Sequence, residues 1–398
     1  MRGYVKLRYK GKNGQKDSYA LIFDVNDETG KRKRKWVTFR GTRKAADAEM
    51  TKILRELDTN TYVDTSKITL AVWLPQWLEL AKSDKREKPL RASTVSRYQN
   101  IIYVRLLKAP FATKPLQKIT AADIEQYYAA QKVSASTLTV DHAILNSAFR
   151  KAKMSKLIIS NPVSDVEHRP RANLDQKSEE IKRHAWTATE AGKFMAKARL
   201  AGPQAAAFYA LALDSGMRKS ELGGLRWGSV DLDAAKVTVK EQLTRMGHEP
   251  TWGPTKGGRV RTVDIAPGTV ALLREHRRVQ AELKMKNRQS YAEFDLVFAK
   301  QWNDVRKRGE MLGHPLQLNN LGQREYARLM REAEVPRIKF HGLRHTCATL
   351  LLNAGEPVHN VSKRLGHKSV MMTMEVYAHL LDGSGQQMAA TMGAILHG

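Results

Sequence analysis

Several residues near the C-terminal end of the chain could together bind or attack a phosphate group. His341, Arg344 and His345 lie within a five-residue stretch, and His367 and Tyr377 follow at wider spacing. Apolar residues recur at helical spacing between them, and glycines stand where helices would end. The pattern predicts short helices whose ends bring two histidines, an arginine and a tyrosine to one anion-binding point.

Each of these residues also has an ordinary structural explanation. A histidine at a helix end is commonly a capping or hydrogen-bonded surface group, and Tyr377 alone could be a core aromatic. His341 and His345 are four residues apart and could bind a metal with His367 as a third ligand. Because Arg344 stands between them and no carboxylate or thiolate completes the set, we predict no metal site.

The charge of the chain indicates a polyanionic partner. Lys and Arg outnumber Asp and Glu by 68 to 40, which gives a net charge of +28 and favours DNA. The length predicts two or three domains, and 42% hydrophobic residues can fill their cores. We find no 18-residue apolar run for a membrane span and no signal peptide. The single cysteine, Cys347, fits a reducing cytoplasm and lies on an apolar helix face, where we expect it to pack.

Residues 1–62 are predicted to form a small DNA-binding domain. Alternating residues indicate strands at 4–9, 18–25 and 35–40, and Thr42 would cap a helix over 44–57. A three-stranded sheet of this kind can enter the DNA major groove. We expect its DNA contacts in the basic run beside the third strand, which consists of Lys31, Arg32, Lys33, Arg34 and Lys35.

Residues 63–165 are predicted to form a helical bundle. Apolar residues at helical spacing indicate four helices, at 68–81, 93–107, 121–131 and 136–153. The following segment, 166–184, is polar and has no periodicity, so we interpret it as a linker.

Residues 185–398 are predicted to form a third domain that supplies two further cations. Arg218 and Glu221 are three residues apart, so Glu221 could hold the Arg218 guanidinium, although an ordinary surface ion pair would look the same. Lys256 precedes two glycines that predict a hairpin turn into a strand at 260–265. After Tyr377, the tail has an apolar segment at 388–396 behind a predicted flexible stretch at 382–385, and this segment could pack on its own subunit or dock into a neighbour.

These residues, in this order, resemble the catalytic pattern of the tyrosine recombinases, the phage integrase family. The resemblance covers roughly residues 186–380 and includes Arg218, Lys256, the His341-x-x-Arg344-His345 motif, His367 and Tyr377. By layout, residues 1–62 are similar to an arm-type DNA-binding domain and residues 63–165 to a core-binding domain. The resemblance implies a multidomain, mainly α protein: a three-stranded β-sheet with a helix, a helical core-binding domain, and a mixed α+β catalytic domain.

The resemblance also implies a reaction and its roles. Tyr377 would attack the scissile phosphate, Arg218 and Arg344 would bind its oxygens, and Lys256 would protonate the leaving oxygen. His341 and His367 would bind the phosphate or help to deprotonate the tyrosine; His345 and Glu221 would support the site. No cofactor is implied. The protein would act as a homotetramer on double-stranded DNA through a Holliday junction, with an excisionase and a host DNA-bending protein as further candidate partners.

Two other functions fit parts of the pattern. A type IB topoisomerase shares the chemistry but works as a monomer, and the arm-like domain and the long tail argue against it. A catalytically silent DNA-binding regulator would not need the full set of site residues. The sequence therefore favours a bacterial, cytoplasmic integrase of a phage or other integrative element.

Overall fold

The structure is a computed structural model, in which the chain divides into two compact units, Met1–Ala172 and Asn173–Gly398. It describes residues 3–11, 15–26, 32–59, 62–83, 90, 92–170, 185–245, 250–301, 311–317, 324–377 and 384–397. Residues outside this described part include Lys31, some of those between the strands of the first sheet, most of the predicted linker and the segment 378–383. Among the described residues, none of the helices combines the length and apolar character that a membrane span requires.

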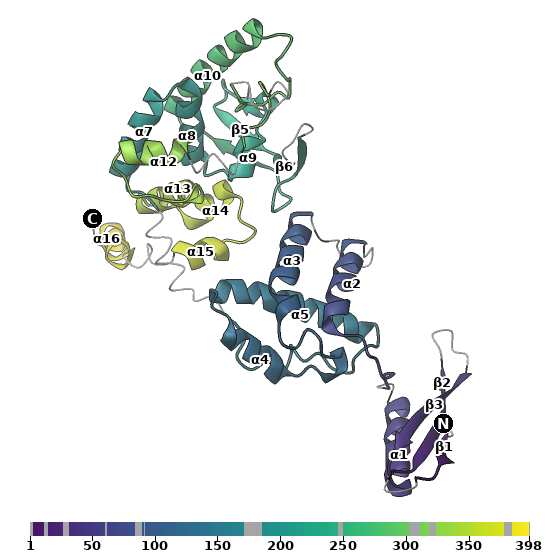
Figure 1. Ribbon diagram of the computed structural model, residues 1–398. Helices are drawn as coiled ribbons and strands as arrows, with labels where there is room; N and C mark the ends of the chain where they lie inside the picture. Colours follow the sequence, from purple (N-terminus) through teal and green to yellow (C-terminus); the bar gives the residue numbers. More distant parts are fainter. Residues whose placement is uncertain are drawn as a thin grey trace. The chain divides into compact units, whose positions relative to one another are not determined.

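The N-terminal residues form an antiparallel sheet covered by one helix (Figure 1). The strands β1 (Gly3–Tyr9), β2 (Ser18–Asn26) and β3 (Arg32–Arg40) pair in sequence order, and α1 (Arg43–Asp58) packs on one face. Thr42 accepts a hydrogen bond from the Ala45 amide and begins α1, as predicted. Alternate residues such as Leu21 and Phe23 fill the core beneath α1, so the other face of the sheet is left open.

Four helices follow in the same unit, as the apolar periodicity predicted. They are α2 (Leu70–Ser83), α3 (Ala92–Val104), α4 (Ala121–Ala130) and α5 (Ala135–Met154), with short 3-10 turns at Leu106–Lys108 and Leu116–Lys118. Their apolar faces share one core, and inside it the Arg105 guanidinium pairs with the buried Asp141 carboxylate. Val166 also lies in this core. The domain boundaries themselves stay predictions.

The second unit is mixed α+β. Its helices are α7 (Ala188–Leu200), α8 (Pro203–Ser215), α9 (Lys219–Gly223), α10 (Pro267–Lys286), α12 (Glu325–Glu332), α13 (His341–Asn353), α14 (Val358–Leu365), α15 (Met371–Tyr377) and α16 (Ser384–His397). The alanine-rich α8 is buried along most of its length and contacts α7, α10 and α13 (Figure 1). Because α8 ends at Gly216, the chain leaves this helix beside α13 and continues to Arg218. The fold class is the multidomain, mainly helical one expected.

Two predictions in this unit are wrong. The strands β6 (Glu241–Arg245) and β7 (Thr251–Pro254) pair with each other, whereas β8 (Arg261–Asp264) pairs with β5 (Lys236–Val239), next to the short β4 (Val230–Asp231). Lys256 therefore lies in a turn that connects two different sheets, and not at the tip of a hairpin. In the tail, α16 already begins at Ser384, so the predicted flexible stretch is helical at its end.

Candidate active site

Arg218 stands at the N-terminus of α9 and is held by Glu221. Its Nη1 donates to Glu221 Oε1 at 2.9 Å, and its backbone amide donates to Oε2 at 2.9 Å. The expected contact is thus present, although Arg218 caps the helix and does not share a helix face with Glu221. The preceding Gly216 has φ +60°, and a Cβ there would lie 2.5 Å from Leu365 Cδ2. Only glycine permits this close approach of the end of α8 to Leu365 on α14.

Glu221 is fully buried and binds a second guanidinium. Arg261 Nη2 donates to its Oε2 at 2.7 Å, and Arg261 Nη1 donates to its Oε1 at 3.3 Å. Burial raises the pKa of the carboxyl group, but hydrogen bonds from Arg261 and Arg218 outweigh this and leave the pKa below its usual value. Glu221 therefore stays ionised and orients both arginines.

Arg344, on α13, has an unpaired donor. The side chain is buried, and Nη1 donates to the Gly216 carbonyl oxygen at 2.8 Å. Its Nη2 is also buried but has no hydrogen-bond partner among the described residues. Burial, and then the charge of Arg218, lower the pKa to about 9, so the guanidinium is still charged at neutral pH. A buried charged donor without a partner is costly, and an anion would satisfy it.

His341 and His367 lie in the field of these arginines. The His367 Nδ1 is 2.7 Å from the Oγ1 of the buried Thr373, which fixes the ring. Burial and the charges of Arg344 and Arg218 lower the pKa of both histidines to about 4. Both rings are neutral at pH 7 and can accept a proton.

Tyr377 ends α15 with its side chain almost fully buried. Its hydroxyl is 2.8 Å from His345 Nδ1, and its ring packs in a cluster with Leu352, Val361 and Leu365. Burial raises the pKa of the hydroxyl above its usual value, while the charge of Arg344 acts in the opposite direction. The phenol is therefore protonated at neutral pH and needs a base before it can attack.

Lys256 is an exposed residue in the turn between β7 and β8. The turn is closed by a hydrogen bond from the Gly258 amide to the Thr255 carbonyl oxygen at 2.9 Å. The Lys256 charge contributes to the lowered pKa of His341, so the ammonium group lies within electrostatic reach of the site.

Four contact residues of the site were not predicted from the sequence. Arg261 holds Glu221, Thr373 holds His367, and Arg364 Nη2 donates to Asp214 Oδ1 at 2.7 Å. Arg261 did carry a signal, because it shares the inward register of its strand with Val263, where an apolar residue is the norm. Cys347 is buried as expected, and its pKa is raised to about 11 by burial.

Two of the histidines expected to matter are not arranged for a metal. His341 and His345 meet edge to face with ring centroids 4.9 Å apart. Across the described residues, no group of three or more His, Cys, Asp or Glu side chains could hold a metal ion.

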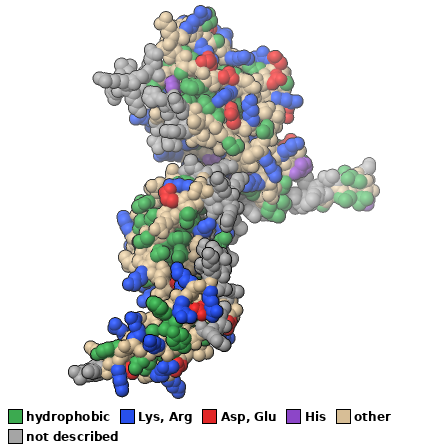
Figure 2. Space-filling model, turned by 90° about the vertical axis from the view of Figure 1, so that its right-hand side faces the viewer, with side chains coloured by type: hydrophobic (Ala, Val, Ile, Leu, Met, Phe, Trp, Pro, Cys, Tyr) green, Lys and Arg blue, Asp and Glu red, His purple; other side chains and the backbone are tan. Residues whose placement is uncertain are grey.

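The basic run of the N-terminal sheet does not form one surface. Arg32 and Arg34 both pair with Asp24, and Lys35 pairs with Asp64. Lys33 has no resolved partner in the described part, and Lys31 lies outside it. By strand register, Arg32 and Arg34 share the open face of the sheet with Tyr4 and Trp36, which are 55% and 73% exposed. On the face drawn in Figure 2, Lys and Arg side chains are scattered among the other residues.

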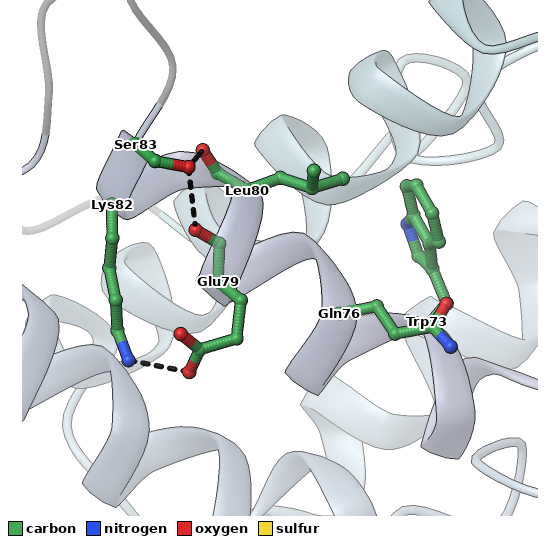
Figure 3. A pocket seen from close by; sticks show the side chains of 6 residues that line it. All are labelled: Trp73, Gln76, Glu79, Leu80, Lys82 and Ser83. Carbon is green, nitrogen blue, oxygen red and sulfur yellow. Dashed lines mark hydrogen bonds and ion pairs between the residues drawn. The ribbon is translucent and has the colours of Figure 1, made fainter.

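A hollow beside α2 contains none of these residues (Figure 3). Trp73, Gln76 and Leu80 line it, together with a Lys82–Glu79 ion pair of 2.5 Å. It has no buried unpaired cation like Arg344, and it does not resemble an anion site.

Known proteins resemble this chain along most of its length. The tyrosine recombinase XerC-like protein of Caldanaerobacter subterraneus subsp. tengcongensis is 27% identical over 389 residues, which cover 93% of this chain and 94% of the relative. The Tn1549 transposon integrase in complex with transposon right end DNA has a TM-score of 0.62 at 20% identity, over 82% of this chain and 99% of that one. A lambda integrase tetramer bound to a Holliday junction gives 0.55 at 19% identity, over 94% of each chain.

The buried guanidinium of Arg344, the partly buried guanidinium of Arg218 and the buried hydroxyl of Tyr377 all belong to this one domain. Residues 186–383 match the phage integrase family. The chain belongs to this family, and it is a tyrosine-type site-specific recombinase.

Proposed function

We propose that this recombinase is the integrase of a phage or other integrative element and that Tyr377 is its nucleophile. The Tyr377 oxygen attacks the scissile phosphorus, a 3′-phosphotyrosyl bond forms, and the bond to the 5′ oxygen breaks. The 5′-hydroxyl of a second strand then attacks the phosphotyrosine, releases Tyr377 and restores a phosphodiester. Because each step exchanges one phosphoester bond for another, ligation needs no ATP.

The residues of the site divide the work of this step among them. Arg218 and Arg344 bind the two non-bridging oxygens, whose charge grows in the transition state. His341 and His367 are neutral and accept the Tyr377 proton or donate to the phosphate. Lys256 protonates the leaving 5′ oxygen. His345 orients Tyr377, and Glu221 orients Arg218.

The unpaired Nη2 of Arg344 is the observation that carries the proposal. This buried, charged donor lies in the same field as Arg218, both neutral histidines and Tyr377. A phosphodiester oxygen supplies the missing acceptor, and the charge of Arg344 also acts on the hydroxyl of Tyr377.

A covalent-adduct assay tests the nucleophile. Wild-type protein and Tyr377→Phe are incubated with attachment-site DNA that carries a nick next to the scissile bond, so that the adduct is trapped. Tyr377→Phe should bind the DNA and form no adduct. The matched control is Tyr326→Phe, which removes a buried hydroxyl that has no partner in the described structure and should leave the adduct intact. An undiminished adduct with Tyr377→Phe would reject this assignment.

We further propose that the enzyme works as a homotetramer through a Holliday junction, in the cytoplasm of a bacterial host. The lambda integrase that this chain resembles is a tetramer on such a junction. An excisionase and a DNA-bending protein would be additional partners. Recombination between two attachment sites supports this proposal, whereas relaxation of supercoiled DNA without recombination favours a topoisomerase and adduct-free binding favours a regulator.

We also propose that the open face of the N-terminal sheet binds arm-type DNA. Trp36, Tyr4 and the neighbouring basic residues project from this face, which α1 does not cover. A sheet face of this width can lie in a major groove. Arg32 and Arg34 of the Lys31–Lys35 run share this face by strand register, and both pair with Asp24 there.

A further inference from the structure

Arg261 connects three segments of the catalytic domain. It begins β8, and its side chain is 8% exposed. Its Nη1 and Nη2 donate to Glu221 on α9, and its Nε donates to the Arg364 carbonyl oxygen on α14 at 3.0 Å. The turn that holds Lys256 ends just before this residue. Arg261 thus contacts the carboxylate that orients Arg218, and it also contacts the carbonyl oxygen of Arg364, two residues before Gly366.

Gly366 leaves the space that the Arg261 side chain occupies. A Cβ on Gly366 would lie 2.9 Å from Arg261 Cδ, 3.0 Å from Nη1 and 3.2 Å from Cζ. The next residue is His367, so the position of the Arg261 guanidinium and the position of the histidine are set by the same backbone. Gly366 also has φ +69°, a conformation that glycine adopts without strain.

The bonds of Arg261 differ from those of the phosphate-binding arginines. All three of its guanidinium nitrogens donate to protein oxygens, whereas Arg344 keeps a buried Nη2 without a partner. A guanidinium that donates in two directions can fix two segments relative to each other, and a lysine ammonium cannot copy this geometry. The bonding pattern suits a residue that holds other residues in place.

We propose that Arg261 is a positioning residue: through Glu221 it sets the orientation of Arg218, and through the Arg364 carbonyl it sets the end of α14 before His367. This inference rests on the proposed function, because Arg218 and His367 matter only if they bind the scissile phosphate. Arg261 itself does not touch the DNA. Its loss should therefore affect the stabilisation of the non-bridging oxygens and leave proton donation to the 5′ oxygen unchanged.

The test compares Arg261→Gln and Arg261→Lys with wild-type protein on three nicked attachment-site substrates. One has the natural phosphodiester, one has a methylphosphonate at the scissile position, and one has sulfur in place of the bridging 5′ oxygen. The methylphosphonate lacks the negative charge that Arg218 must neutralise, and the sulfur substrate does not need an acid for its leaving group. Arg274→Gln, which breaks an ion pair with Asp233 in the same domain, is the matched control.

On the natural substrate, both Arg261 variants should bind DNA normally and form the adduct about 100-fold more slowly, since small misplacements in an active site cost this much. The methylphosphonate should remove most of this difference, and the sulfur substrate should not. Arg274→Gln should match wild type on all three. If Arg261→Gln proves poorly folded by thermal melting, the same ratios are measured on Arg261→Lys, which keeps the charge.

Three results would overturn the inference. An equal loss on all three substrates would mean that Arg261 only maintains the fold, and no loss would mean that it has no role. Rescue by sulfur would mean that it acts through Lys256. Failure of the wild-type protein to form any adduct is a separate result, because it would reject the proposed function and not the role of Arg261.

Discussion

At the scale of single residues, the proposed catalytic groups differ in which phosphate oxygen they contact, a non-bridging oxygen or the leaving 5′ oxygen. Arg344 offers a buried unpaired Nη2, and an unsatisfied buried donor costs about 1–3 kcal/mol, more when charged. Binding of an anion at this site is therefore favourable, because it gives this donor an acceptor. Lys256 is exposed and lies in a turn, so its contribution depends on where the DNA places the leaving oxygen. Substrates with altered phosphate oxygens can distinguish a group that binds the non-bridging oxygens from one that protonates the leaving oxygen.

Lys256→Ala should bind attachment-site DNA normally but cleave it about 100-fold to 10,000-fold more slowly, because a proton donor to an alkoxide contributes this much. Sulfur in place of the bridging 5′ oxygen should restore its cleavage rate, measured as covalent adduct over time, since a thiolate leaves without a proton. Arg259→Ala, in the same turn and also exposed, serves as the control and should cleave at the wild-type rate. Absence of sulfur rescue would show that Lys256 positions DNA and that another group is the acid.

Acid should destabilise the DNA-free protein through its site histidines. In the folded protein the pKa of His341 and of His367 is lowered to about 4, against about 6.5 in an unfolded chain. Between these values the unfolded chain binds more protons than the folded one, so this contribution to stability is complete above pH 6.5 and is lost as the pH falls toward 4. The melting temperature should drop across this window. His367→Gln should reduce the drop, and His359→Gln, at an exposed position, should not; equal drops in both variants would argue against this assignment.

At the scale of elements, two helix ends set the spacing of the site. The segment after α13 turns at Gly355, with φ +85°, and α14 ends at Gly366, with φ +69°. Both are left-handed positions that favour glycine. They differ in their surroundings, because no atom lies within 4 Å of a Cβ on Gly355, whereas Arg261 fills that space at Gly366.

Alanine at these two glycines should separate backbone strain from displacement of Arg261. Gly355→Ala should lower the free energy of unfolding by roughly 1–2 kcal/mol and leave cleavage unchanged, since only the left-handed conformation is penalised. Gly366→Ala should lower it further and also slow adduct formation, because the new Cβ displaces Arg261. Denaturant unfolding and the adduct assay measure the two effects. Equal cleavage rates in the two variants would show that the site tolerates a shift of Arg261.

The sequence could predict the elements of this region because their signals are local. Gly366 ended a helix as expected, and Thr42 began one. The pairing of β7 could not be predicted in the same way. The two glycines after Lys256 correctly indicate a turn, but which strand β7 meets depends on Trp252 lying opposite Leu243, in a strand that precedes it.

The site contacts that were not predicted also depend on residues far apart in the sequence. Arg344 donates to Gly216 across 128 residues of sequence, and Arg261 reaches Glu221 across 40. No short pattern encodes such a pair; only the packing of α8, α13 and β8 brings its members together. The catalytic motif was visible because its residues repeat a family pattern, whereas Arg261, Thr373 and Asp214 support that motif from outside it.

At the scale of the whole molecule, the described residues contain separate hydrophobic cores for the N-terminal sheet, the helical bundle and the catalytic domain. The core under α1 is built from Tyr19, Leu21, Phe23, Met50 and Leu57 and shares no residue with the bundle. Tyr62 packs on Phe23, which places the edge of this first core next to the boundary predicted at residue 62. The N-terminal domain can therefore be removed without opening another core.

Deletion of residues 1–62 tests whether this domain serves a separate class of DNA site. The shortened protein should form the covalent adduct on a short core site at the wild-type rate, because the bundle and the catalytic domain keep their cores. Its affinity for DNA with linked arm and core sites should fall by about 10²–10⁴-fold, the usual gain from joining two binding modules, and integration should fall with it. The full-length variant Trp36→Ala, altered only on the open sheet face, should share the loss on linked sites and keep core cleavage. If the deletion abolishes core cleavage while Trp36→Ala leaves both activities intact, the domain supports the fold of the bundle and the open face is not a DNA surface.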